Sequence, residues 1–463
     1  MATLSEIEKW LQDRLPALLA EHEVPGTAVA VLFGGEVIDH GAGVLSKATG
    51  VETTADTVFQ IGSITKVWTT TLVMQLVDEG KVDLDKPVRD YLPEFVLKDD
   101  EAAAVITVRQ LLSHQAGFEG DIFNETGKGD DAVEKFMPTL AEVGQLFAPG
   151  ELFSYNNAGF VVLGRLIEVL RGKPYDAVLR EHLFTPLGLT HAATDPYEAI
   201  LHRAAVGHIR PAPDEAPVPA PMWAMTRGMA PAGAMLAMRP RDLLTFAALH
   251  LNEGKAADGT AVLSAASVKA MQEPQVKVPA LGLMGDSWGL GWEIFDWDGT
   301  TVIGHDGGTI GQNAFLRIVP EHGFAVSVLT NGGDTIELYK AVAGHVVKEL
   351  TGLDLPALPT PPDTAVPIDA DRMLGTYSCE VADFTIRQND DGKIWLDQTP
   401  KGIFAELGPA PEPVELVGRN AESLIAVKAE NGVHLPQVFL GDDGSGHALY
   451  LHNGRAIRRA TTA

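Results

Sequence analysis

Hydrophobic positions near the start of the chain repeat first with the period of a helix. Apolar side chains recur at helical spacing from Ile7 to Leu18, which predicts an amphipathic helix with one buried face. Ser5 and Glu8 have the spacing of a capping box, in which each side chain bonds the other residue's backbone N–H. Pro25-Gly26 is a helix stop. We therefore predict a helix that begins at Ser5 and ends near His22.

Further along, the pattern alternates between blocks typical of strands and blocks typical of helices. β-rich runs predict strands over 27–33, 36–39, 301–305, 313–319 and 324–330. Helical spacing predicts helices over 63–79, 107–113, 158–171, 240–251 and 337–350. Strands at both ends with helices between them favour an α/β (α+β) fold, in which an antiparallel sheet is flanked by helices and joined to a helical subdomain.

Five prolines between Pro356 and Pro367 mark a change in the pattern. Such a density is unfavourable inside a helix or a strand, so the segment predicts a semi-rigid linker. Short β-like runs with turn residues follow it and predict a small all-β barrel or sandwich. The predicted organisation is a first domain over 1–353, a Pro-rich linker over 354–368 and a small all-β domain over 369–463.

Composition excludes several classes of protein. The chain carries 35 Lys plus Arg against 62 Asp plus Glu, a formal charge of −27. This charge opposes binding to nucleic acids and to anionic membranes, and no apolar run approaches the ~20 residues that span a bilayer. The single cysteine, Cys379, allows no intramolecular disulfide. Because the first residues also lack the pattern of a signal peptide, we expect a cytoplasmic protein.

A first candidate for chemistry lies at the start of the second predicted helix. Ser63 and Lys66 are three residues apart, so their side chains lie on one helix face about one turn apart. A serine hydroxyl is a poor nucleophile unless a neighbouring base takes its proton. Ser63 would lie in the first turn, where free backbone N–H groups and the helix dipole favour a developing anion.

Two further segments have matching chemistry. Tyr155 close to a lysine ammonium would have a stabilised phenolate, and its pKa could then fall toward the working pH, so that Tyr155 could act as a general base. Asn157 follows two residues later and could hold a lysine or a substrate carbonyl. Gly307 and Gly308 end a predicted strand; paired glycines allow close approach to a ligand, and a strand N–H opposite the Ser63 N–H would complete an oxyanion hole.

Each segment also has an ordinary structural explanation. S-x-x-K occurs on many surface helices, Tyr and Asn are common in turns, and a glycine-rich hairpin can carry an exposed His. The three patterns together, in the order S-x-x-K, Y-x-N and H-x-G, are far less expected by chance. With Leu111-Leu-Ser-His-Gln-Ala-Gly117, Pro149-Gly150 and Ala230-Pro-Ala-Gly233, they make the sequence resemble the penicillin-binding-protein-like serine hydrolases, near class C β-lactamases, D-aminopeptidases and related esterases.

That resemblance extends from about Ser5 to Leu353 and implies roles for the motif residues. Ser63 would be the acylated nucleophile, while Lys66 and Tyr155 would share the proton transfers. Asn157 would orient Lys66 and the substrate, and the backbone N–H groups of Ser63 and Gly308 would form the oxyanion hole. Enzymes that it resembles carry lipocalin-like barrels beside the cleft, which the all-β domain would match, although the domain could equally be a passive packing module.

The third motif departs from the pattern of many β-lactamases. His305 replaces the frequent Lys, and its ordinary pKa near 6.5 makes its charge conditional at neutral pH. Asp306 replaces a Thr that helps to bind the drug carboxylate. An inward Asp306 would disfavour efficient β-lactamase activity and favour an ester or amide donor, whereas an outward one would weaken this argument.

Other candidates come from the loops. Asp121 and Phe123 lie in an acidic loop over 120–131 that either lines the cleft or is simply solvated; Gly307 would also contact substrate. His114, in an apolar turn, is predicted to be structural. No H-E-x-x-H or paired His and Cys pattern occurs, so we expect neither a metal nor a cofactor.

The predicted function is an acyl transfer through an acyl-serine formed from an ester or amide and resolved by water, as in an esterase or peptidase. An alternative is a cytosolic amide-forming transacylase or peptide cyclase of specialised metabolism, in which an amine resolves the intermediate. A silent binding protein and a true β-lactamase are weaker alternatives. The expected partners are a small-molecule or peptide acyl donor and, for the alternative, an amine acceptor, with no nucleic acid or membrane; the oligomeric state stays open.

Overall fold

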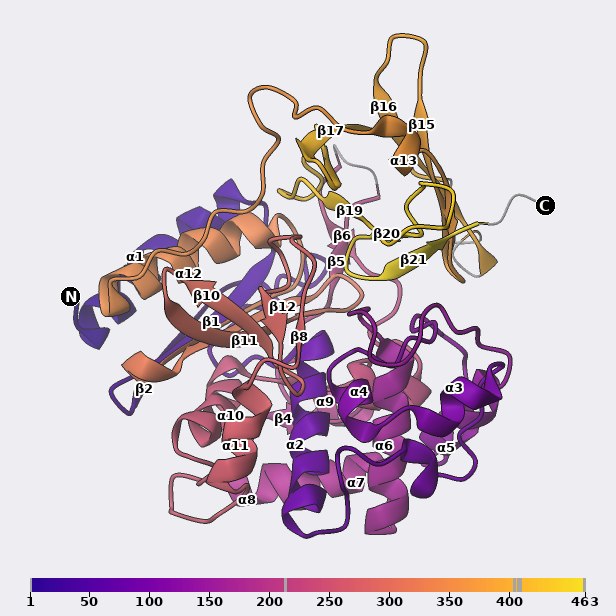
Figure 1. Ribbon diagram of the computed structural model, residues 1–463. Helices are drawn as coiled ribbons and strands as arrows, with labels where there is room; N and C mark the ends of the chain where they lie inside the picture. The colour runs from indigo at the N-terminus through magenta and orange to yellow at the C-terminus, as the bar shows by residue number, and fades with distance from the viewer. Residues whose placement is uncertain (1, 212–214, 403–404, 406–409, 461–463) are drawn as a thin grey trace.

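Two bodies joined by a long connection make up the structure (Figure 1). The structure is a computed structural model, and it describes residues 2–211, 215–402, 405 and 410–460. The first body is a large antiparallel sheet with helices on both faces, and the second is a closed barrel. This arrangement confirms the predicted fold class and shows that the small all-β domain is a barrel rather than a sandwich.

The large sheet joins strands from both ends of the first domain. Its order is β2-β1-β13-β12-β11-β10-β9-β8, and Thr27 of β1 pairs with Thr330 of β13. Gly34 and Gly35 form the expected two-residue turn between β1 and β2. The strands are β1 (Gly26–Phe33), β2 (Glu36–Gly43), β8 (Val276–Lys277), β9 (Ser287–Trp288), β10 (Glu293–Trp297), β11 (Thr300–Gly308), β12 (Asn313–Val319) and β13 (Phe324–Thr330).

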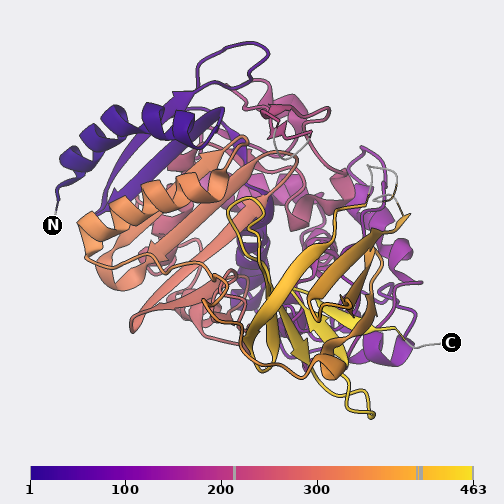
Figure 2. The same ribbon diagram turned by 90° about the horizontal axis from the view of Figure 1, so that it is seen from above.

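Two helices cover the outer face of this sheet, α1 (Leu4–Glu21) and α12 (Thr335–Thr351). They lie side by side in both views (Figures 1 and 2), and Trp10 stacks on His345 between them. The capping box at the start of α1 is formed by Thr3 and Glu6 rather than by Ser5 and Glu8. Both pairs have the same spacing, so the local pattern could not choose between them.

A helical block covers the inner face, and it is built around α2 (Thr65–Asp78) and α10 (Pro240–Leu251). Trp68 of α2 stacks on Phe246 of α10 at 3.9 Å between ring centres. The other helices are α3 (Asp100–Val105), α4 (Val108–Leu112), α5 (Ala132–Phe136), α6 (Asn157–Arg171), α7 (Tyr175–Leu179), α8 (Thr185–Leu187), α9 (Pro196–Ala199) and α11 (Ala265–Gln272). Short strands complete this part of the domain: β3 (Phe59–Gln60), β4 (Ala192–Ala193), β5 (His208–Ile209), β6 (Val218–Pro219) and β7 (Ala237–Met238).

The second body is a closed eight-stranded barrel whose strands follow the order of the chain. Between Thr351 and Ala370 the chain forms no helix or strand, and α13 (Ala370–Met373) then leads into the barrel. The strands are β14 (Gly375–Ser378), β15 (Ala382–Gln388), β16 (Ile394–Pro400), β17 (Val414–Asn420), β18 (Ser423–Ala426), β19 (Pro436–Leu440), β20 (Tyr450–His452) and β21 (Ala456–Arg459). Closure leaves no free sheet edge.

Across the residues that the structure describes, none of the helices combines the length and the apolar character needed to cross a bilayer.

Candidate active site

Ser63 lies where the first helical turn of the inner block meets the sheet. It belongs to a short helical turn, Gly62–Ile64, that runs directly into α2. Gly62 has φ +53°, and a Cβ there would lie 2.6 Å from the backbone nitrogen of Gly308. Only glycine allows this close approach of the turn to β11. The hydroxyl of Ser63 is thus placed at the junction of the helix and the sheet.

Lys66 is fully buried beside this hydroxyl. Its Nζ lies 3.0 Å from Ser63 Oγ, and it also donates to the carbonyl oxygen of Ala232 at 2.6 Å. Burial lowers the pKa of Lys66 well below its ordinary value; the positive charge of Arg455 lowers it further, and Asp121 opposes both. A neutral amine within hydrogen-bond distance of a serine hydroxyl can accept its proton.

Tyr155 is buried next to the Lys66 amine. The Lys66 Nζ lies 4.8 Å from the centre of the Tyr155 ring. Burial raises the pKa of the Tyr155 phenol above its ordinary value, against the lowering effects of the Ser63 side chain and of Arg455. The expectation that this pKa falls toward neutrality is therefore wrong for the free protein, because the desolvation of the phenolate outweighs the nearby charges. The phenol is protonated and can serve as a proton donor.

Asn157 is the first residue of α6, and it is oriented by a carboxylate rather than by the lysine. Its Nδ2 donates to Asp121 Oδ1 at 2.7 Å, whereas the hydrogen bonds of Lys66 go to Ser63 and Ala232 within the described ranges. The expected direct contact between Asn157 and Lys66 is thus not formed here. Asp121 links the two through its charge, which raises the pKa of Lys66.

His305 lies on β11, buried beneath the site. Its Nδ1 donates to the carbonyl oxygen of Asp306 at 2.6 Å. Burial, together with the charge of Lys66, lowers the pKa of His305 to about 3. The expectation of a conditional charge at neutral pH is wrong, because the imidazole stays neutral there.

Asp306 points away from this site, because successive side chains of a strand lie on opposite faces. Its carboxylate accepts two hydrogen bonds from the guanidinium of Arg317, at 2.6 and 2.9 Å. The outward alternative for Asp306 therefore holds, and Asp306 places no acid in the site. Only the missing Thr hydroxyl still distinguishes this motif from that of many β-lactamases.

Gly307 and Gly308 bring the end of β11 against the Ser63 turn. A Cβ on Gly307 would lie 1.9 Å from the carbonyl oxygen of Ile61 and 3.1 Å from the backbone nitrogen of Ser63. No side chain fits in that space. The backbone N–H groups of Ser63 and Gly308 thus come from two chain segments in direct contact, as a two-donor oxyanion hole requires.

The barrel contributes to the same site through the turn between β20 and β21, a contribution that the sequence analysis missed. Gly454 accepts a hydrogen bond from the backbone N–H of Tyr155 at 3.0 Å. Arg455 donates to Asp121 at 2.6 Å from Nε and 3.3 Å from Nη2, and its Cζ lies 5.0 Å from the centre of the Tyr155 ring. These partners are more than 290 residues apart, and an Asn-Gly-Arg turn gives no signal of such a contact.

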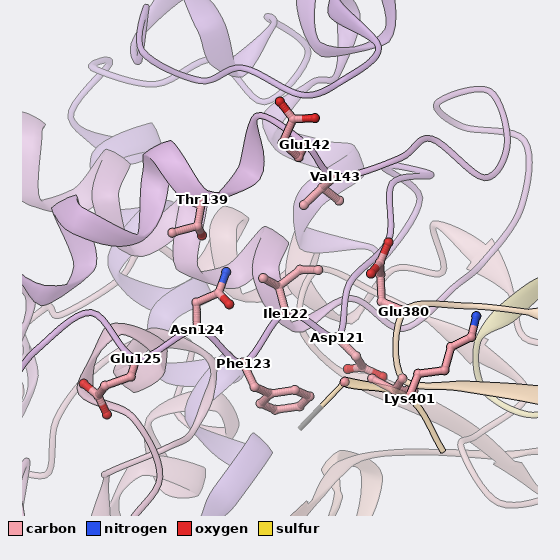
Figure 3. A pocket seen from close by; sticks show the side chains of 12 residues that line it. Asp121, Ile122, Phe123, Asn124, Glu125, Thr139, Glu142, Val143, Glu380 and Lys401 are labelled. Atoms are coloured by element: carbon pink, nitrogen blue, oxygen red, sulfur yellow. The ribbon is translucent and has the colours of Figure 1, made fainter. Parts of the chain in front are cut away.

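Asp121 and Phe123 line a cavity between the loop over 121–125 and the barrel (Figure 3). Its volume is about 470 Å³, and most of its charged side chains are acidic. The charged lining residues are Asp121, Glu125, Glu142, Glu380 and Lys401. The cavity adjoins the candidate site through Asp121, which bonds Asn157 and Arg455, while Ser63 lies outside the cavity lining. Across the described residues no group of three or more His, Cys, Asp or Glu side chains is placed to hold a metal.

The sheet, the inner helical block and the paired Ser63 and Lys66 side chains define a class of serine hydrolases. The model of the family described as Beta-lactamase matches residues 11–349. The chain belongs to this family, whose members are serine hydrolases.

Curated relatives agree with this assignment. The chain is 43% identical to penicillin-binding protein 4 of Amycolatopsis lactamdurans over 371 residues, which is 80% of this chain and 97% of that protein. It is 28% identical to an unguisins hydrolase of Aspergillus campestris over 324 residues, which is 66% of this chain and 58% of that protein.

The solved structure of SurE is similar to both bodies of the chain. It is 27% identical, covers 99% of this chain and 100% of its own, and has a TM-score of 0.78. A second SurE structure, solved with D-Leu, is 28% identical with a TM-score of 0.75 and covers 98% and 100% of the two chains. The likeness therefore includes the barrel as well as the β-lactamase domain.

Proposed function

We propose that this protein is a serine acyl-transfer enzyme that forms an acyl-serine at Ser63 from an ester or amide and releases it to water. The observation that supports this most is the 3.0 Å contact between Ser63 Oγ and the buried Lys66 amine. Burial favours the neutral form of that amine. Nucleophile and base are thus paired before any substrate arrives.

In the first half of the proposed reaction, the Ser63 hydroxyl gives its proton to Lys66 Nζ as Oγ bonds to the substrate carbonyl carbon. The resulting oxyanion accepts hydrogen bonds from the backbone N–H groups of Ser63 and Gly308. The bond to the leaving alcohol or amine then breaks, and the leaving group takes a proton from the Tyr155 phenol. The proton held by Lys66 restores the phenol.

In the second half, water attacks the acyl-serine carbonyl carbon and loses a proton toward the same pair of side chains. The bond to Ser63 Oγ breaks, Oγ regains a proton, and the acid product leaves. His305 stays neutral throughout, because the pKa of its imidazole is about 3. We assign it to the wall of the site rather than to charge binding.

We further propose that the acyl donor is a peptide or amino-acid derivative with a D-residue at the acyl position. The support is the structure of SurE solved with D-Leu, which is similar to 98% of this chain. The hydrolase of unguisins among the relatives fits a peptide substrate. Matched activated esters of D- and L-leucine would test this point, and faster turnover of the L-ester would contradict it.

Aminolysis is the second candidate function, and the cavity beside Asp121 is the observation that favours it. Its volume of about 470 Å³ and its acidic lining suit a cationic amine acceptor. An activated ester should be offered with and without a panel of amines, and the products analysed. Formation of the acid alone under every condition would remove this alternative.

Intact-mass labelling with a fluorophosphonate tests the serine nucleophile itself. A single adduct is expected on the wild-type protein and none on Ser63→Ala. The absence of an adduct on the wild-type protein would favour a silent binding protein, and an adduct that survives Ser63→Ala would refute Ser63 as the nucleophile. Turnover of a β-lactam at the rate of the esters would favour a true β-lactamase. A cytoplasmic location stays a prediction that cell fractionation would test.

A further inference from the structure

His114 occupies an unusual position in the fold. Its side chain is fully buried, yet its backbone has φ +58°, a conformation that is uncommon and costly for residues other than glycine. The other described non-glycine residues with positive φ are all solvent-exposed: Glu23, Glu253, Asp298 and Asn431. A strained backbone inside the protein persists only where the surroundings enforce it.

The contacts of His114 converge on the segment that carries Tyr155. The carbonyl oxygen of His114 accepts a hydrogen bond from the Ser154 N–H at 2.9 Å, and its Nδ1 accepts one from the Asn156 N–H at 2.9 Å. The imidazole stacks on the Tyr155 ring, with 4.3 Å between ring centres and 29° between planes. One residue thus holds both neighbours of Tyr155 and the ring itself.

The protonation state of this imidazole follows from the same contacts. Because Nδ1 accepts a hydrogen bond, the neutral ring carries its proton on Nε2. Burial and the nearby cationic groups lower the pKa of His114 well below its ordinary value, so Nδ1 remains an acceptor. Nε2 is buried and has no hydrogen-bond partner among the described residues. Leaving a buried donor unsatisfied costs stability, so the site keeps this ring at a cost.

We propose that His114 is a positioning residue, which fixes the Tyr155 phenol for proton transfer by bracketing its backbone and stacking on its ring. The inference rests on the proposed function, in which Tyr155 protonates the leaving group. It goes beyond the scaffold role expected from the sequence. Substitution of a scaffold residue would lower the stability of the whole fold, whereas substitution of a positioning residue would lower only the activity that depends on the Tyr155 hydroxyl.

Two substitutions separate the possible contributions of His114. His114→Gly relieves the backbone strain, because glycine adopts positive φ freely, but removes both the acceptor and the ring. His114→Asn keeps an oxygen close to the place of Nδ1 and also tolerates positive φ. We expect His114→Gly to lower kcat for an activated ester at least about tenfold with KM within about twofold, and His114→Asn to recover part of that loss.

A double-mutant cycle with Tyr155→Phe is the decisive measurement, since Phe keeps the ring and removes the hydroxyl. In that background His114→Gly should change kcat by less than about twofold. His250→Asn is the matched control: His250 is also buried, and its ring packs edge-on against Phe246 and Trp292. It should lower the melting temperature without lowering kcat.

Full additivity of His114→Gly and Tyr155→Phe, with Ser63 labelling intact, would overturn this inference alone. An equal fall in kcat for His250→Asn would do the same. Failure of Ser63 to label, or a Tyr155→Phe variant with wild-type kcat, would overturn the proposed function and this inference with it. Should His114→Gly not fold, the same cycle with His114→Asn gives the answer, because its smaller loss should also vanish in Tyr155→Phe.

Discussion

Removal of the positive charge of Arg455 should shift the pH dependence of Ser63 acylation. Lys66 Nζ and Arg455 Cζ lie 4.8 and 5.0 Å from the centre of the Tyr155 ring, so they are at most about 10 Å apart. At an effective dielectric constant of about 20, two unit charges at that distance interact by about 1.7 kcal/mol. Because the Arg455 side chain is 37% exposed, solvent screening reduces this interaction to about 1 kcal/mol.

The sign of the shift depends on which form of Lys66 reacts. The neutral amine accepts the Ser63 proton, and Arg455 lowers the pKa of Lys66. Arg455→Met should therefore raise that pKa and move the acidic limb of the acylation profile to higher pH. Asp121 raises the pKa of Lys66, so Asp121→Asn should move the same limb to lower pH.

The second-order rate of fluorophosphonate labelling, followed by intact mass from about pH 5 to 10, measures this limb without relying on recognition of the natural acyl donor. Arg387→Met is the matched control, because it removes one charge of a barrel ion pair with Asp397 that has no contact with the site. Shifts in the same direction for Arg455→Met and Asp121→Asn, or no shift in either, would refute the reasoning.

Three further predictions concern the same site. Lys66→Ala and Tyr155→Phe should each lower kcat at least about 100-fold if they transfer protons; near-normal rates would contradict this. Gly307→Ala would place a Cβ 1.9 Å from the Ile61 carbonyl oxygen and so push β11 away from the Ser63 turn. Fluorophosphonate labelling of Ser63 should then slow at least about tenfold, in a protein whose circular dichroism spectrum is normal. Unchanged labelling would exclude an oxyanion hole at this place. Burial, with the negative charge of Asp306, raises the pKa of Glu293 above its ordinary value. Wild-type stability should therefore fall as pH rises above the ordinary pKa of a glutamate, and Glu293→Gln should remove this loss; parallel urea-unfolding stabilities of the two proteins from pH 5 to 8.5 would contradict it.

The regular elements of the first domain were predictable because their signals are local. The helix over 240–251 and the strands over 313–319 and 324–330 coincide with α10, β12 and β13, since periodicity and turn residues within each segment determine them. The boundaries of the barrel strands were less predictable. Between β14 and β15 the chain turns over 379–381, and a short turn without Gly or Pro leaves no mark in the sequence.

The candidate site was predictable only where a side-chain pattern carries the chemistry. Ser63 and Lys66 are one helical turn apart, so their contact follows from spacing alone. The Ala232 carbonyl that holds Lys66 has no side-chain signature. Burial raises the pKa of Tyr155 and lowers that of His305. Burial is a property of the whole fold, so neither shift could be predicted from two neighbouring residues.

The role of the barrel was left open by its sequence, and its contacts favour one answer. The connection between β20 and β21 bonds three consecutive residues of the first domain. The His452 ring bonds the Phe153 carbonyl oxygen, and the Ala456 N–H donates to the Ser154 hydroxyl. The Gly454 carbonyl oxygen accepts from the Tyr155 N–H. A module that served only for packing would bury apolar surface at a distance from the chemistry. This one holds the backbone of the proposed proton donor and neutralises Asp121 beside it. The barrel therefore forms a wall of the proposed active site, and the position of its Arg455 bears directly on the charge that Lys66 experiences.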